Sequence, residues 1–335
     1  MNTTFQRARE FIHRNARPLD LARWQYHFEN GSTEAVLNAL SYYQNDDGGF
    51  GHALEADAWN PNSSPIQTWT ATEILREINY TDNTHTIIKG ILHYLESGKS
   101  FDGKCWYKIV KSNNEHPHSP WWHTEIDSTD HNDYNPTACL AGFIIRFAEK
   151  NSELYKRGCR IAKEAFDQLL AAERENGMHT LTCYLRLMKY IKEAKAIDII
   201  DLAAVKAGLS GLIHCCITQE TTEWETSYVC KPSQFLDCPD SMFYTDNQKA
   251  ADFECDFIAR TQLDATSMDG SGIDIWRGTE CNQAADAIMC IIDLTKHDSE
   301  IKVLIGCTEE EKKIVYQTHN GSEHMKGIMI RRFDL

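Results

Sequence analysis

The sequence predicts an all-α fold built from helical hairpins, and three observations support this prediction. Apolar residues recur at helical spacing along most of the chain, as in Ile87, Ile88, Ile91 and Leu95. Helix start signals stand where several of these periodic segments begin. A turn with glycine and an aromatic residue follows a helix-terminal glutamine more than once, which is typical of stacked helical hairpins.

About eleven helices are expected along the chain. Ser32 is a suitable cap for the third, and the stretch SPIQ at 64–67 starts the fourth with the features of a capping box. Asn135-Pro136 is expected to open the sixth in the same way. The expected ranges are 5–16, 18–29, 33–44, 65–79, 84–97, 136–149, 152–175, 178–193, 197–216, 248–262 and 280–296.

The pattern changes near residue 300. The segments KKIVYQT and KGIMIRRF flank HNGSEH, whose Asn320-Gly321 suits a turn between two short strands. A frayed helix fits this stretch nearly as well. We therefore expect one helical domain over 1–300 and a C-terminal extension over 301–335 that contains a short β-hairpin or a helix end.

The composition excludes several classes of protein. The chain carries 49 acidic against 34 basic residues, which argues against non-specific nucleic-acid binding and against binding to an anionic membrane surface. No run of about 18 apolar residues occurs, so no integral membrane span is expected. The N-terminus lacks the apolar stretch of a signal peptide, which favours a cytoplasmic location. The 12 cysteines form no CxxC pair and are expected to be buried free thiols.

Four long connections separate the helices, at 45–64, 98–134, 218–247 and 263–279. Compact domains seldom carry several such loops without a functional reason. Together these loops hold 19 acidic and 6 basic residues, and they hold six of the eight tryptophans. Since tryptophan is seldom left in solvent, we expect the loops to converge into one aromatic, electronegative mouth. The six are Trp59, Trp106, Trp121, Trp122, Trp224 and Trp276.

Several of these motifs resemble a known family. A helix-terminal Gln44 followed by Gly48, Gly49 and Phe50, with a weaker echo from Gln262 to Trp276, is similar to the QW-type repeat of the terpenoid cyclase and protein prenyltransferase superfamily. With HPHSPWWH and YNPTACLAGF, the chain resembles an uncharacterised bacterial branch of squalene-cyclase-like repeat proteins over roughly residues 30–295. The resemblance implies a single α/α toroid, a ring of inner and outer helices with a central cavity. A helix-terminal glutamine can satisfy backbone groups of a neighbouring turn and glycine permits tight turning, so Gln44, Gly48 and Gly49 are expected to be architectural.

The acids of the first long loop are the candidates for catalysis. Asp47, Glu55 and Asp57 lie with His52 in a loop that contains no Lys or Arg. Clustered carboxylates raise one another's pKa, and a protonated carboxyl can donate a proton to an alkene or a leaving oxygen. The resemblance implies an acid-initiated carbocation reaction, although the Asp-x-Asp-Asp motif of the cyclases does not occur. Alternatively, Glu55 and Asp57 cap helices or pair with distant arginines.

Substrate contacts are expected from aromatic residues of the same loops and of the helix after them, because aromatic faces bind cations, apolar chains and sugars. The candidates are Trp59, Trp69, His118, Trp121, Trp122, Trp224 and Trp276. Histidines and aspartates at 116–133 include metal-ligand types without the spacing of a known site, so neither a metal nor another cofactor is expected.

Three functions remain open. The first is binding or acid-catalysed transformation of a small hydrophobic, isoprenoid-like ligand in a central cavity. The second is a carbohydrate-active enzyme, a glycosidase or lyase, in which tryptophans stack on sugars and two carboxylates cleave the bond. The third is a non-catalytic binding protein. An isoprenoid site needs a closed apolar cavity, whereas a sugar site needs an open surface with polar edges. The oligomeric state is left open.

Overall fold

Ten α-helices make up most of the part of the chain that the structure describes. This computed structural model describes residues 3–127, 134–171, 177–218, 220–225, 227–236 and 241–261. Within these ranges only isolated β-bridges accompany the helices, which confirms the all-α prediction. The α-helices are α1 (Thr3–Asn15), α2 (Pro18–Phe28), α3 (Thr33–Ser41), α4 (Pro65–Glu77), α5 (Thr86–Ser97), α6 (Thr137–Phe147), α7 (Glu153–Ala171), α8 (Met178–Glu193), α9 (Leu202–Cys216) and α10 (Tyr244–Thr261).

Five short 3₁₀-helices lie in the connections between these helices. They are η1 (Lys111–Glu115), η2 (Pro120–Trp122), η3 (Ile197–Ile199), η4 (Thr221–Glu225) and η5 (Pro232–Gln234). The expected helix at 280–296 and the C-terminal extension at 301–335 lie outside the described residues. No helix within those residues combines the length and the apolar character that crossing a bilayer requires.

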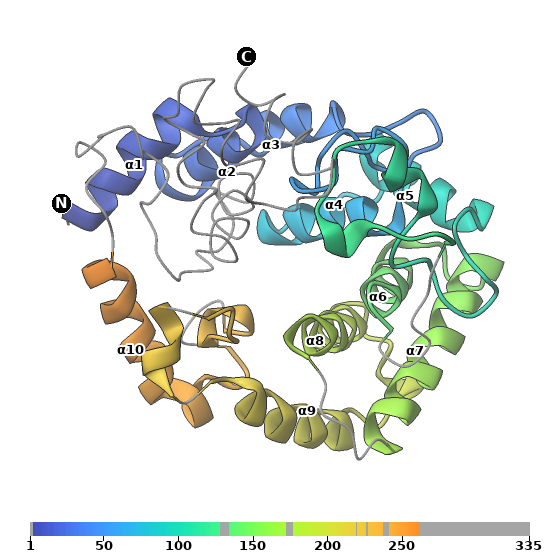
Figure 1. The fold of residues 1–335 in the computed structure, drawn as a ribbon. Helices are drawn as coiled ribbons and strands as arrows, with labels where there is room; N and C mark the ends of the chain where they lie inside the picture. The colour runs from blue at the N-terminus through green and yellow to red at the C-terminus, as the bar shows by residue number, and fades with distance from the viewer. Residues whose placement is uncertain are drawn as a thin grey trace.

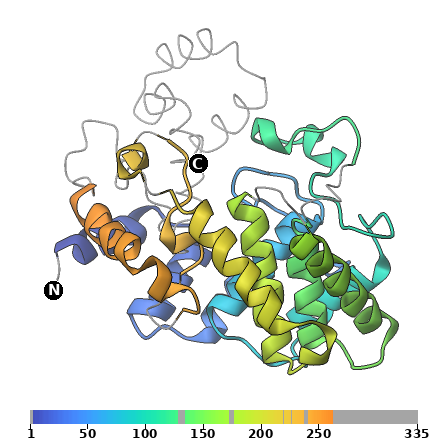
Figure 2. The same ribbon diagram turned by 90° about the horizontal axis from the view of Figure 1, so that it is seen from below.

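The helices follow one another around an arc, and α10 returns to the side of the molecule that α1 occupies (Figures 1 and 2). Helices α6 and α8 lie nearer the middle of this arrangement than α7 and α9 (Figure 1). Burial agrees, because α6 buries all but one of its residues and packs against α4, α5, α7 and α8. By contrast, α9 buries a single stripe, Val205, Leu209 and Ile213. The chain therefore forms an inner and an outer set of helices over this stretch.

The helix start signals have different outcomes. The Ser32 and Ser64 hydroxyls accept from the backbone N–H groups of Ala35 and Gln67, as the sequence predicts for α3 and α4. The prediction for Asn135-Pro136 is wrong. Helix α6 begins at Thr137, Pro136 occupies the cap position, and no side chain caps this end. The Asn135 side chain instead accepts a hydrogen bond from a cysteine of α8.

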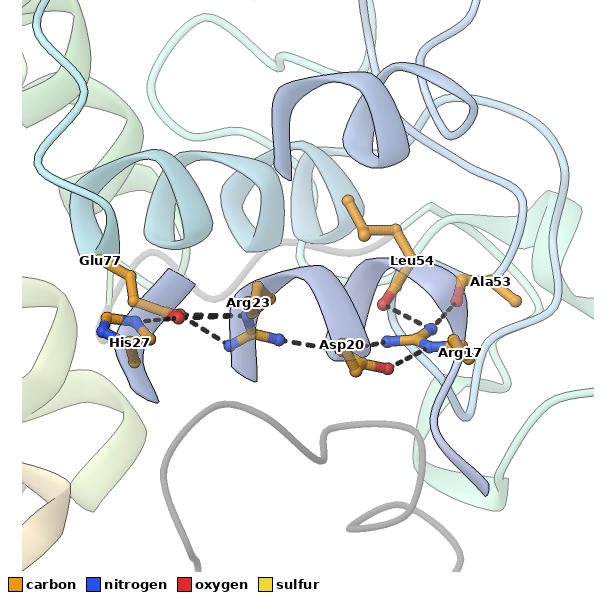
Figure 3. A network of polar contacts seen from close by, with 7 residues as sticks. All are labelled: Arg17, Asp20, Arg23, His27, Ala53, Leu54 and Glu77. Atoms are coloured by element: carbon orange, nitrogen blue, oxygen red, sulfur yellow. Dashed lines mark hydrogen bonds and ion pairs between the residues drawn. The ribbon is translucent and has the colours of Figure 1, made fainter. Parts of the chain in front are cut away.

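Buried ion pairs join α2 to α4 (Figure 3). Arg23 donates to Asp20 on its own helix (3.1 Å) and to Glu77 at the end of α4 (2.7 Å), and all three side chains are almost fully buried. His27 lies 2.7 Å from the other oxygen of Glu77. Burial alone would raise the pKa of Glu77, but Arg23 and His27 outweigh it and hold this pKa below its ordinary value.

Arg17 extends this network to the loop that follows α3 (Figure 3). Its guanidinium donates to Asp20 (2.7 Å) and to the carbonyl oxygens of Ala53 (2.7 Å) and Leu54 (3.4 Å). Ala53 has a positive φ of 61°, a conformation that an L-residue adopts only when its surroundings hold it there. The N-terminal helices therefore fix the backbone just before Glu55 and Asp57.

Candidate functional site

The glutamine and glycines of the first long loop join it to α5. The Gln44 amide donates to the carbonyl oxygens of Gly48 (2.9 Å) and Ile87 (3.2 Å). Gly48 has φ +83°, and a Cβ on it would lie 2.1 Å from the carbonyl oxygen of Gly90 on α5. These positions therefore have the architectural role that the sequence motif indicates. This turn packs the loop against α5, and Glu55 and Asp57 follow it in the chain.

Asp47 is part of this architecture. Its carboxylate accepts from the Ser63 hydroxyl (2.6 Å), the Gly49 amide (3.0 Å) and the Lys99 ammonium (2.7 Å). Burial alone would raise the pKa of Asp47, but these donors outweigh it, so the pKa lies below its ordinary value. Asp47 is therefore not the loop carboxyl whose pKa is raised. The 45–64 loop holds no cation of its own, but Lys99 reaches it from just beyond α5.

His52 and Glu55 each make a contact with a neighbouring segment. His52 has φ +59°, and its Nε2 lies 2.8 Å from the side-chain oxygen of Asn45. Glu55 is half-buried, and the Thr70 hydroxyl of α4 donates to its Oε2 (3.1 Å). The loop thus places Glu55 against α4, while exposed His52 stays with the start of the loop.

Asp57 holds two tryptophans. Only 5% of Asp57 is exposed, and each of its carboxylate oxygens accepts an indole N–H, Oδ2 from Trp121 (2.8 Å) and Oδ1 from Trp122 (2.6 Å). Hydrogen bonds to an ionised acceptor are stronger than neutral ones. Trp121 remains 44% exposed in spite of this anchor. We call Trp121 and Trp122 the tryptophan pair.

Backbone pairing brings the tryptophan pair to Asp57. Ala58 and His118 form an antiparallel bridge, the Ser119 amide donates to the Asp57 carbonyl oxygen (2.8 Å), and the Trp59 amide donates to that of Pro117 (2.9 Å). Pro120 then starts η2 at the position where its missing N–H costs nothing. The Asp57 carboxylate and the two indoles therefore meet because their backbones already run side by side.

Asparagines hold the two loops together, and the sequence analysis missed them. The Asn60 amide donates to Ser112 (2.8 Å) and to the side-chain oxygen of Asn113 (3.0 Å). Asn113 in turn donates to the carbonyl oxygen of Trp122 (3.1 Å). The signal was the density of asparagine in both loops, since this side chain bonds readily to nearby backbone and tolerates turn conformations.

His118 and His123 form a short chain that leads from the interior to the surface. Buried His118 donates from Nδ1 to the His116 carbonyl oxygen (2.6 Å), and its Nε2 lies 3.4 Å from Nδ1 of His123. Nε2 of His123 lies 3.2 Å from Glu125, which is exposed.

Of the remaining predicted contacts, Trp59 lies at this site and the others lie elsewhere. Trp59 is half-buried beside the bridge and donates to the Ala56 carbonyl oxygen (2.9 Å). Trp69 of α4 packs against the core. Trp224 is fully buried against Phe253 and Phe257 of α10, which lies across the molecule from α4 and α5 (Figure 1). Trp276 lies outside the described residues.

The site thus brings together Asp57, Trp59, His118 and the tryptophan pair, and Glu55 lies in the same turn as Asp57. Trp224 is not part of it. Among the residues that the structure describes, no group of three His, Cys, Asp or Glu side chains is arranged to hold a metal ion. Comparison of the chain with known protein families, characterised proteins and solved structures finds no match.

Proposed function

We propose that the chain is a ring of helical hairpins that binds a carbohydrate at the tryptophan pair. The inner and outer helices support the ring, since α6 and α8 are buried on nearly all sides whereas α9 buries one stripe. Within the ring, the loops at 45–64 and 111–127 supply the binding residues. The proposal departs from the isoprenoid hypothesis on the nature of the ligand.

The observation that carries the proposal is the exposure of an anchored tryptophan. Trp121 is 44% exposed while its N–H is bonded to buried Asp57, so a flat apolar surface is held in place at the solvent boundary. Tryptophan combines a large apolar face with a polar N–H, which suits it to wet binding surfaces. The neighbouring His123 and Glu125 are exposed and polar. An open aromatic face with polar edges favours a sugar over an isoprenoid chain.

Glu55 is the acid that we assign to catalysis. Asp47 and Asp57 each accept several hydrogen bonds that fix the loop, and their loss would disturb the fold. Glu55 is half-buried two residues before Asp57. In glycoside hydrolysis a carboxyl donates a proton to the leaving oxygen, while water bonds to the sugar carbon and gives up a proton to a base. Glu55 would take the first of these roles.

The test is calorimetric titration of the full chain with a panel of oligosaccharides and with farnesol as an isoprenoid probe. We expect saturable binding of an oligosaccharide and none of farnesol. Trp121→Ala should weaken this binding by about tenfold, the effect of about 1.4 kcal/mol, and Tyr42→Ala, which removes another exposed aromatic, should leave it unchanged. Glu55→Gln should retain binding and lose hydrolysis. Binding of farnesol alone would favour the isoprenoid hypothesis.

A further inference from the structure

Two cysteines from different segments meet at the end of α9. Cys216 is the last residue of this helix, and its thiol lies against that of Cys230, which itself donates to the carbonyl oxygen of Lys231 (3.8 Å). The backbones are also paired, since the Thr218 amide donates to the Cys230 carbonyl oxygen (2.9 Å). Cys216 is half-buried and Cys230 is buried. One thiol of the pair is therefore within reach of a small molecule in solution.

Contact with Cys230 also makes the thiol that solvent reaches more acidic than an ordinary cysteine. This contact outweighs burial and holds the pKa of Cys216 below its ordinary value. Since the thiolate is the nucleophile in thiol–disulfide exchange, this contact favours attack by Cys216.

A second pair in the same chain provides a comparison. Cys139 of α6 and Cys183 of α8 are also in side-chain contact, but both are fully buried. Burial raises the pKa of Cys139 well above its ordinary value. This pair lacks access to solvent, and Cys139 also lacks thiolate character, so the pair should stay reduced under conditions in which the first pair reacts.

We propose that Cys216 and Cys230 form a reversible disulfide, with Cys216 as the thiol that first attacks a low-molecular-weight disulfide. This inference is independent of the carbohydrate proposal.

The exchange proceeds in two balanced steps. The Cys216 thiolate attacks one sulfur of the small disulfide, whose S–S bond breaks, and one small thiolate leaves. The Cys230 thiol then loses its proton and attacks the Cys216 sulfur of the mixed disulfide, and the second small thiolate leaves. The protein loses two hydrogens and two electrons, and the small disulfide is reduced to two thiols.

A disulfide between Cys216 and Cys230 would join the two ends of the segment that connects α9 to η5. That segment includes η4, whose Trp224 packs edge-on against Phe253 and Phe257 of α10. The indole N–H of Trp224 donates to the carbonyl oxygen of Thr218 (3.0 Å), and Thr218 is two residues after Cys216 in the chain. Oxidation would therefore tie the end of α9 to the segment that covers α10.

The experiment is incubation of the full chain with oxidised glutathione, followed by alkylation of free thiols and peptide mapping. Cleavage after glutamate separates the two cysteines, because Glu220, Glu223 and Glu225 lie between them. We expect a linked Cys216–Cys230 peptide that dithiothreitol resolves. Cys230→Ser should instead trap glutathione on Cys216. Cys139 should react at least about tenfold more slowly than Cys216.

Two control variants make the result specific. Cys215→Ser removes the exposed neighbour of Cys216 and should leave the linked peptide unchanged, and Cys183→Ser should do the same because its partner is buried. The proposal is overturned if Cys216 remains free while exposed Cys215 or Cys255 carries glutathione. It is equally overturned if the peptide that forms links Cys230 to a cysteine other than Cys216.

Discussion

At the scale of single residues, Gly48 makes the sharpest contact in the loop. A methyl group there would meet a carbonyl oxygen of α5 at 2.1 Å and would also strain a φ of +83°. We expect Gly48→Ala to destabilise the fold by about 3 kcal/mol, since strain and overpacking add. Gly211→Ala, in open space on α9, should stabilise it by about 0.5–1 kcal/mol. Urea unfolding measures the free energy of unfolding of both variants. A change in the same direction in the two variants would contradict this account.

Glu29 predicts a dependence of stability on pH. Burial alone would raise its pKa, but hydrogen bonds with His13, Trp24 and Arg9 outweigh it and lower the pKa from 4.5 to about 2. A lowered carboxyl pKa contributes stability above the ordinary pKa, and this contribution is lost as pH falls from 4.5 towards about 2. Glu29→Gln should therefore flatten the fall in unfolding midpoint over this window. Glu96→Gln, at an exposed site, should leave the fall as steep as in the wild type.

The sequence could predict these residues only in part. Gln44 and its glycines follow from a local pattern, because a helix end and a turn need those residue types nearby. The charge state of Asp47 does not, because Lys99 reaches it from a segment 52 residues further along the chain. Asp57 likewise accepts from two indole N–H groups of residues that are far away in sequence.

At the scale of elements, the buried ion pairs between α2 and α4 carry a prediction. Arg23→Met would remove the cation that buried Asp20 and Glu77 share, leaving Asp20 with Arg17 and Glu77 with His27, and we expect a loss of about 3 kcal/mol. Arg160→Met removes an exposed pair with Glu164 and should change stability by no more than about 0.5 kcal/mol. Equal effects of the two changes in urea unfolding would mean that the network does not hold these helices together.

Helix positions were the most predictable feature. Each of the ten α-helices within the described residues corresponds to an expected range, because apolar periodicity and caps are local signals. The ends differ where a second signal competes. The ninth helix was expected from 197, but a 3₁₀ turn occupies Ile197–Ile199, and α9 begins at Leu202 behind a capping Asp201. The Asp201 signal was visible in the sequence and was missed.

At the scale of the whole molecule, composition predicted that the loop tryptophans would meet, and the packing separates them. The loops at 45–64 and 111–127 share a backbone bridge that brings the tryptophan pair to Asp57. Trp224 instead fills space against α10, on the other side of the molecule. The abundance of an amino acid in loops does not say which loops are neighbours, because that depends on how the helices are arranged in space.

The central claim is that Asp57 holds the tryptophan pair as a carbohydrate-binding surface, and Asp57→Asn tests it most directly. Asparagine would turn an N–H₂ group towards one indole N–H, so one anchor is lost. Titration of the folded variant with the oligosaccharide that the wild type binds should show affinity lower by at least about tenfold, with Trp121 more accessible to acrylamide quenching. Unchanged affinity in a folded variant with unchanged quenching would contradict the claim.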